Sequence, residues 1–269
     1  MNNTFSIRRF GKLIAKELTE RIRIILIISI SISLAYIAYV LWETLMDGNP
    51  IISMGARTSF IIFASLLTSV FAPFILYKDI NHKRKGVDYI TLPVSVNEKF
   101  LSMVLISLVV TPLAIFSTLL LADTLAVLIH RPPFGIFIFS KGSGSLSYIL
   151  NQVSNYSALP FLTFAGNLHF RENKVVKTLL FCAAFWAIYI FVVSLVSALL
   201  VDEYNDQIQK IIESEGMQNN SSLMENPLAT IENFPVLKLF VNIMTAIFTI
   251  GVPIGALIFS HFKMRKLQY

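Results

Sequence analysis

The chain has 269 residues, of which 55% are hydrophobic and only 14% are charged, and it carries a formal net charge of +6. Soluble domains average about 25% charged residues. This composition, with a mean hydropathy of +0.69, therefore excludes an ordinary soluble protein and indicates one embedded in a lipid bilayer. The positive charge does not indicate a nucleic-acid partner, because the basic residues flank apolar runs and form no soluble basic patch.

The first predicted element is an amphipathic helix over residues 5–21, in which apolar residues share one face and basic residues occupy the other. We expect it to lie flat at the membrane surface, with its cations toward anionic headgroups. The apolar run that follows is too long for the core of a cleavable signal peptide, so we expect it to remain as a membrane span. The apolar face consists of Ile7, Phe10, Ile14 and Leu18.

Six apolar runs are long enough to cross a bilayer, which takes about 20 helical residues. The fourth is the weakest, because it contains several amides and Pro160, and Pro112 is expected to kink the third. The predicted fold class is therefore an all-α membrane protein, a single domain over residues 1–269 with six transmembrane helices. The spans are expected near residues 24–45, 57–77, 100–128, 148–167, 178–201 and 236–260.

The basic residues indicate how these spans are oriented. Lysines and arginines gather before the first span, between the second and third, between the fourth and fifth, and after the sixth. Cytoplasmic loops of membrane proteins carry this excess. We therefore expect a multi-pass protein of the cytoplasmic membrane with both termini in the cytoplasm. Asp123 and Glu43 fall near the opposite ends of their spans, where we expect solvated rim residues.

The segment between the second and third spans, residues 78–100, has the most distinctive pattern. A charged turn leads through a glycine to a short half-apolar stretch, which a proline ends. Ser95 then begins the next helix with Glu98 three residues on, which is the spacing of a capping box. The pattern predicts a short helix-like element fixed at both ends to membrane spans. Its apolar side chains are Val87, Tyr89, Ile90 and Leu92.

The sequence contains no recognisable catalytic or nucleotide-binding motif. The run SKGSGS at residues 140–145 lacks the spacing of a phosphate-binding loop, and we interpret it as a flexible connection. The four histidines are scattered, which does not favour a metal site, and Cys182 lies in an apolar run as a core residue. We therefore expect no enzymatic activity and no cofactor in this chain.

Polar residues inside two predicted spans have two open interpretations. Amides on one face of the fourth span and a polar stripe in the sixth either hold a neighbouring helix or line a substrate path. In the sixth span Gly251 and Gly255 follow the stripe as a GxxxG pair, which favours close helix packing. The polar residues concerned are Asn151, Gln152, Asn155, Asn242, Thr245 and Thr249.

The order of these features resembles the membrane subunit of ABC-2-type ATP-binding cassette transporters. An amphipathic N-terminal helix, a basic segment between spans two and three, and structured residues between spans five and six follow that layout. The stretch RKGVDYITLPVSVNEKFLSMVL is similar to the family's pattern of a charged residue with glycine, Leu-Pro-Val/Ala-Ser and Lys-Phe-Leu. The stretch FRENKVVKTLL is similar to the second cytoplasmic loop of short permeases from bacteria of the Bacteroides group.

This resemblance implies a coupling helix near residues 81–92 that docks on a separate ATPase chain, which would bind the ATP and Mg. It also implies that two such half-transporters pair in the bilayer, as a homodimer or heterodimer. The expected function is that of a permease subunit exporting an unknown substrate. The alternative is a membrane scaffold or assembly subunit that transports nothing. The residues expected to contact the ATPase are Lys83, Arg84, Lys85, Gly86, Asp88, Tyr89, Leu92 and Pro93.

Overall fold

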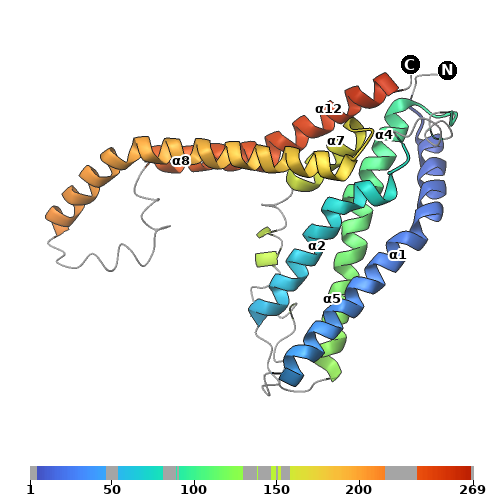
Figure 1. Ribbon diagram of the computed structural model, residues 1–269, viewed down its shortest axis with the longest axis horizontal. Coiled ribbons are helices and arrows are strands. Elements are labelled where there is room, and N and C mark those ends of the chain that lie inside the picture. The colour runs from blue at the N-terminus through green and yellow to red at the C-terminus, as the bar shows by residue number, and fades with distance from the viewer. Residues whose placement is uncertain are drawn as a thin grey trace.

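The computed structural model consists of helices joined by turns, and the residues it describes contain no strand (Figure 1). The described residues are 5–46, 54–80, 89, 91–129, 138, 147–149, 151–152, 158–215 and 235–267. The helices are α1 (Ile7–Met46), α2 (Met54–Leu76), α4 (Val96–Val104), the π-helix η1 (Leu105–Val110), α5 (Thr111–Ile129), α7 (Ala158–His169), α8 (Lys174–Glu215), α11 (Pro235–Ala246), the π-helix η2 (Ile247–Gly251) and α12 (Val252–Leu267).

Within the described residues, five helical stretches are long and apolar enough to cross a membrane. The fold is therefore that of an all-helical, multi-pass membrane protein, in agreement with the coarse prediction from the sequence. Many large apolar side chains on the outer faces of these helices are exposed, as expected for surfaces that contact lipid. The five stretches are Ile7–Glu43, Met54–Leu76, Val96–Leu128, Lys174–Val196 and Asn242–Lys266.

Helices α1, α2 and α5 form the main bundle and bury a core along its whole length (Figure 1). We call the end at which α1 begins, α2 ends and α12 ends the basic end, and the opposite end of this bundle the far end. Toward the far end the core contains Tyr36, Ile61 and Leu119. Toward the basic end it contains Tyr77 and Phe164, so that α7 also packs there.

The helix predicted over residues 5–21 and the first predicted span form one continuous helix, α1, of 40 residues. At about 1.5 Å per residue it is about 60 Å long, twice the thickness of the hydrocarbon core. Its first turns therefore extend beyond the membrane at the basic end. Of the predicted apolar face, Phe10, Ile14 and Leu18 are half-buried and Ile7 is 81% exposed, whereas the most buried residues of this stretch are Leu13 and Glu17.

The fourth predicted span is not a full helix in the part of the chain that the structure describes. Helix α7 has 12 residues, too few to cross a bilayer, and it is buried along most of its length. Helix α5 ends at the far end and α7 lies at the basic end (Figure 1), and most of the residues between them lie outside the described ones. Residues 147–149 and 151–152 are helical, and Ile149 is buried in the far-end core.

Two prolines widen the helices that contain them. The π-helix η1 lies just before Pro112, and η2 lies just before Pro253. A proline lacks the N–H that would bond four residues back, and its ring crowds that carbonyl, so a wider turn relieves the conflict. Beside η1, the Thr111 hydroxyl donates to the carbonyl of Ile106 at 2.7 Å and satisfies an oxygen of the widened turn. The predicted distortion at Pro112 is therefore a π-turn.

Helix α8 leaves the main bundle sideways with η2 packed against it, whereas α12 runs back over α7 to the basic end (Figure 1). Cys182 and Phe185 of α8 pack with Leu162 of α7 and Ala256 of α12, which confirms Cys182 as a core residue. Farther along, Trp186 and Tyr189 both contact the ring of Phe248. Helix α8 continues through residues 202–215, beyond the predicted end of the fifth span near residue 201. The main bundle and this pair of helices are thus joined mainly through α7.

Candidate functional site

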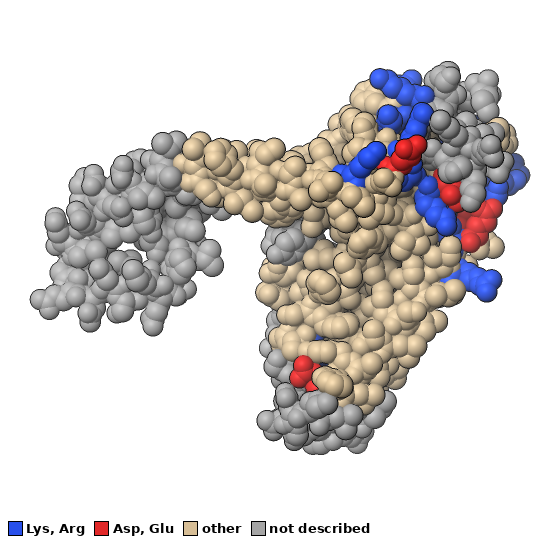
Figure 2. Space-filling model, in the orientation of Figure 1, with Lys and Arg blue, Asp and Glu red and all other residues tan. Residues whose placement is uncertain are grey.

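The most elaborate polar arrangement of the described residues lies at the basic end. Lysines and arginines gather there over the start of α1, the turn after α2, the turn before α8 and the end of α12 (Figure 2). These are the segments whose charge led us to expect them on one side of the membrane. The structure brings them together at one end of the molecule. The exposed basic residues described there include Arg8, Lys12, Lys16, Lys78, Arg171, Lys177, Arg265 and Lys266.

The two basic turns at this end are in direct contact. The Lys174 ammonium group donates to the backbone carbonyl of Lys78 at 2.6 Å. The turn before α8 owes its shape to Asn173, whose φ of 50° lies in the left-handed region that asparagine tolerates better than most residues. Beside it, the Asn167 amide donates to the carbonyls of Pro73 and Tyr77 at 2.8 and 3.3 Å. These bonds fasten α7 and the start of α8 to the end of α2.

The predicted capping box at Ser95 is confirmed. The Ser95 hydroxyl accepts from the backbone N–H of Glu98, and the Glu98 carboxylate accepts from the backbone N–H of Ser95 at 2.9 Å. The same carboxylate accepts from the backbone N–H of Ser6 at 2.7 Å and from Arg9 at 3.3 Å. Because Ser6 immediately precedes α1, the fully buried Glu98 lies at the N-termini of two helices, α1 and α4, where a negative charge is favourable.

A second buried carboxylate, Glu17 of α1, fixes the turn after α2. It accepts from the hydroxyl of Tyr77 at 2.7 Å and from the hydroxyl of Tyr89 at 2.8 Å. The Arg21 guanidinium lies 3.9 Å from Glu17 and 3.9 Å from the centroid of the Tyr77 ring, so it neutralises the carboxylate and stacks on the ring. Burial, and then the charge of Glu17, raise the pKa values of Tyr77 and Tyr89 well above their usual value.

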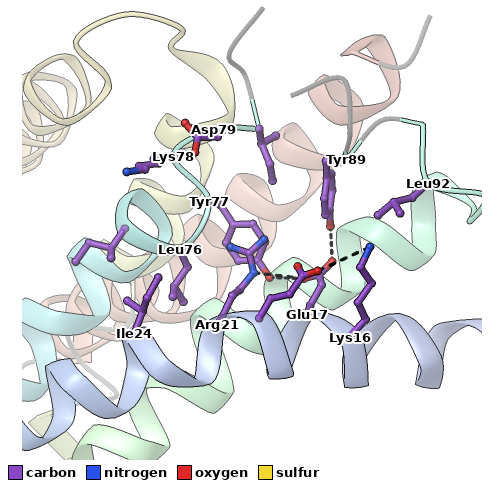
Figure 3. A pocket seen from close by; sticks show the side chains of 13 residues that line it. Lys16, Glu17, Arg21, Ile24, Leu76, Tyr77, Lys78, Asp79, Tyr89 and Leu92 are labelled. Atoms are coloured by element: carbon purple, nitrogen blue, oxygen red, sulfur yellow. Dashed lines mark hydrogen bonds and ion pairs between the residues drawn. The ribbon is translucent and has the colours of Figure 1, made fainter. Parts of the chain in front are cut away.

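This network forms one wall of a pocket of about 380 Å³ between α1 and the segment that follows α2 (Figure 3). In that view Ile24 and Leu76 lie at the left, Arg21, Glu17 and Lys16 rise from α1 below, and Lys78 and Asp79 lie above them. Leu92 closes one side of it. The full lining consists of Lys16, Glu17, Glu20, Arg21, Ile24, Ile75, Leu76, Tyr77, Lys78, Asp79, Ile80, Tyr89 and Leu92.

The residues predicted to contact an ATPase have different positions. Tyr89 was expected to project into a partner, but its hydroxyl is turned inward to Glu17 and its ring packs against the basic-end core. Leu92 is half-buried against the pocket, and Pro93 is exposed. The inward turn of Tyr89 follows from the buried carboxylate on α1, which no local pattern reveals. Lys83, Arg84, Lys85, Gly86 and Asp88, with most of the predicted coupling helix, lie outside the described residues.

The polar residues of the fourth and sixth predicted spans lie on separate elements. Asn151 is exposed and Gln152 half-buried, whereas Asn155 lies outside the described residues. Asn242 and Thr245 are exposed on α11, and the hydroxyl of Thr249 donates to the carbonyl of Thr245 at 2.8 Å. Gly251 and Gly255 are also exposed, and a Cβ placed on Gly255 would meet nothing within 4 Å. Both interpretations of these residues therefore stay open.

The sequence analysis missed a buried ion pair at the far end. Asp123 is 2% exposed and accepts from Arg57 through both carboxylate oxygens, so its prediction as a solvated rim residue is wrong. Tyr36 donates to the same carboxylate at 2.5 Å. A signal for this pair was present, because an arginine and an aspartate fall near the same predicted end of neighbouring spans. The three side chains tie α1, α2 and α5 together.

Comparisons of the chain with protein-family models, with curated proteins and with solved structures find no match. Function therefore has to follow from the residues and their geometry. Chemically, the basic end holds carboxylates that are already saturated with hydrogen bonds, which suits them to fixing helices in place. The lysines and arginines on its outer surface suit it to binding a negatively charged partner.

Proposed function

We propose that the chain is the membrane-spanning subunit of an ABC-2-type ATP-binding cassette transporter, and that a separate ATPase docks on the basic end. The main support for this proposal is that the segment 77–95 is hydrogen-bonded to α1 and joined rigidly to the start of α4. Tyr77 and Tyr89 bind Glu17 of α1, and Ser95 caps α4 through Glu98. A force applied to this segment would therefore reach the first and third spans directly.

The proposed roles of individual residues follow from their positions. Tyr89 is a positioning residue that joins the coupling segment to α1 and does not itself bind the ATPase. Lys83, Arg84, Lys85 and Asp88 are the candidates for the contact itself, because they lie between the two fixed points of the segment. ATP and Mg belong to the partner, and this chain carries out no catalysis. Closure of the ATPase would then tilt α1 and the α4–α5 run together.

The remaining parts of the proposal rest on charge and on the layout of the chain. The basic end faces the cytoplasm, since cytoplasmic segments carry the excess of lysine and arginine. Both termini lie on that side of the cytoplasmic membrane, and the transported substrate is exported. Two chains form the complete pathway, either as identical copies or with a second permease. Asn242 and Thr245 are candidates for that path or interface, because they are exposed in the single chain.

The experiment is to express the tagged full chain in its source cells, to purify it in detergent and to measure which ABC ATPase, if any, is retained with it. Replacing Lys83, Arg84 and Lys85 together with alanine should reduce the retained ATPase several-fold. The matched control replaces Arg8, Lys12 and Lys16, which removes the same charge from α1. If both triple variants lose the ATPase equally, docking on the coupling segment is wrong. If no ATPase is retained by the unaltered chain, the scaffold alternative is favoured.

A second variant distinguishes the binding of the ATPase from the transmission of its movement to the membrane helices. Tyr89→Phe keeps the ring but removes the bond to Glu17, so the ATPase should remain bound while its stimulation by the membrane subunit falls. Tyr148→Phe removes a hydroxyl from a 51% exposed tyrosine and should change neither property. If the membrane subunit with Tyr89→Phe still stimulates ATP hydrolysis as the unaltered chain does, movement is not transmitted through the bond between Tyr89 and α1.

A further inference from the structure

The pocket between α1 and the turn after α2 lies at the boundary between apolar and charged sequence on both helices. On α1 the charged residues end at Arg23 and the apolar run begins at Ile24, which lines the pocket. On α2 the apolar run ends at Leu76, and Lys78 follows on the pocket rim. In a spanning helix this change marks the level of the lipid headgroups. The pocket therefore opens at headgroup depth.

The charges inside this pocket are already neutralised, whereas its rim holds exposed and half-exposed side chains of both signs, of which Asp79 also interacts with Lys174. Glu17 is occupied by two tyrosine hydroxyls and by Arg21. On the rim, Lys16 and Glu20 stand 3.8 Å apart and are each more than half exposed, so their interaction is weak. Lys78 and Asp79 add a second cation and a second anion to the lining from the turn after α2, and in Figure 3 their charged ends point away from Glu17.

The mixture of signs on this rim restricts which ligand fits. A phosphate alone would approach Lys16 and Lys78 but would also face the carboxylates of Glu20 and Asp79. A simple amine would approach Glu20 and Asp79 but would also face the ammonium groups of Lys16 and Lys78. A group that carries both a phosphate and a primary amine has a partner for each sign, and its ammonium can donate three hydrogen bonds. A quaternary ammonium has the charge but no N–H to donate.

We propose that this pocket binds the headgroup end of a membrane phospholipid that bears both a phosphate and a primary amine, as phosphatidylethanolamine does. On binding, the side chains of Lys16 and Lys78 turn toward the phosphate, and those of Glu20 and Asp79 turn toward the amine. The acyl chains leave the pocket over Ile24 and Ile75, which line it and are 40% and 42% exposed. The volume of about 380 Å³ is that of a small-ligand site. The lipid joins α1 to α2 below the segment 77–95.

Native mass spectrometry of the purified full chain in detergent tests this proposal without any ATPase, so its outcome does not depend on the transport function. The chain is mixed with equal amounts of dioleoyl phosphatidylethanolamine, phosphatidylcholine and phosphatidylglycerol. The expected result is at least threefold more bound ethanolamine lipid than either of the others. Equal retention of the three lipids would overturn the proposal.

Two charge-matched pairs of variants identify the site. Glu20→Gln with Asp79→Asn removes the partners of the amine, so the preference should shift toward phosphatidylglycerol. Its control is Glu43→Gln with Glu172→Gln, which makes the same change of charge outside the pocket and should keep the original preference. Lys16→Ala with Lys78→Ala should lower retention of all three lipids, whereas Lys12→Ala with Lys177→Ala should not. If the pocket variants behave like their controls, the lipid binds elsewhere and the site is wrong.

Discussion

Arg57 of α2 and Asp123 of α5 form a bidentate ion pair inside the membrane bundle. Their two hydrogen bonds measure 2.8 and 2.6 Å, and the side chains are 1% and 3% exposed. Such a pair has lost the hydration of both charges, so its net contribution to stability is small, but each charge depends on the other. The pair therefore specifies which faces of α2 and α5 meet. Tyr36 of α1 donates to the same carboxylate, so the pair also fixes which face of α1 packs against α2 and α5.

The first prediction concerns the free energy of unfolding of variants of this pair. Asp123→Ala should lower it by roughly 3–5 kcal/mol, because Arg57 is left buried and uncompensated. Arg57→Met with Asp123→Leu should be close to neutral or stabilising, since neither charge remains. Glu20→Gln breaks the exposed pair with Lys16 and should change stability by less than about 1 kcal/mol. Unfolding of the purified chain by titration with a denaturing detergent measures all three, and a double variant as unstable as the single one would contradict this account.

The difference between the two carboxylates Glu98 and Asp123 shows what the sequence reveals. The capping box of Glu98 is a local signal, because Ser95 and Glu98 are three residues apart and the helix start lies between them. The pairing of Asp123 with Arg57 joins residues 66 positions apart and depends on which helix faces meet. Hydropathy gives the depth of a residue in the membrane but not its neighbour. The sequence therefore predicted the capping role of Glu98 and misjudged the burial of Asp123.

The same distinction applies to α1 and Tyr89. The amphipathic pattern of residues 5–21 predicted a helix correctly, but periodicity contains no information on whether that helix continues into the next one. The half-apolar character of the segment with Tyr89 was visible, whereas its inward direction depends on Glu17, 72 residues earlier in the chain. For α7, Pro160 and the amides indicated a weak span, and packing against α2 and α12 shows why a short helix is stable there.

The second prediction concerns the contact between α7 and α8. A Cβ added to Gly166 would overlap the side chain of Thr178, so Gly166→Ala should lower the free energy of unfolding by about 1–3 kcal/mol. Combining it with Thr178→Gly should recover part of that loss, because the colliding atoms are removed. Gly255→Ala is the matched control: its Cβ enters open space, and alanine favours a helix over glycine by about 1 kcal/mol. Destabilisation by Gly255→Ala would instead indicate a second chain packed against that glycine.

The third prediction concerns orientation in the membrane. In a Cys182→Ser background, a cysteine at position 206 should react with a membrane-impermeant maleimide on intact cells. A cysteine at position 171 should react only after permeabilisation, because the basic end faces the cytoplasm. Cys182 is 6% exposed, so its replacement by serine removes the background with a small change in volume. Labelling of position 171 but not 206 from outside would reverse the orientation and contradict a cytoplasmic ATPase site.

The fourth prediction concerns the response to alkaline pH. The pKa values of Tyr77 and Tyr89 are raised in the folded chain, whereas an unfolded tyrosine ionises near pH 10. Stability due to these two phenols is therefore complete below about pH 10 and is lost as the pH rises above it, by up to roughly 1.4 kcal/mol per pH unit for each tyrosine. Tyr77→Phe with Tyr89→Phe should flatten this loss, and Tyr148→Phe should not. Equal pH slopes for the two variants would show that the phenols ionise normally in the fold.

The last prediction compares the two halves of the capping box. Ser95→Ala removes one acceptor from the start of α4 and should cost about 1 kcal/mol of unfolding free energy. Glu98→Gln should cost more, roughly 1–3 kcal/mol, because its carboxylate accepts from the backbone N–H groups of Ser6 and Ser95 and an amide group would turn a donor toward one of them. Arg9→Ala is the control, because that side chain is 35% exposed and its bond to Glu98 is longer, at 3.3 Å.

Amide hydrogen exchange distinguishes the two effects by location. Ser95→Ala should increase exchange at the start of α4 alone, whereas Glu98→Gln should increase it at the starts of both α1 and α4, since one carboxylate binds both. If Glu98→Gln affects α4 only, Glu98 does not join the two helices in solution. The route by which the segment 77–95 reaches α1 would then depend on Glu17 alone, and Tyr89→Phe would be sufficient to interrupt it.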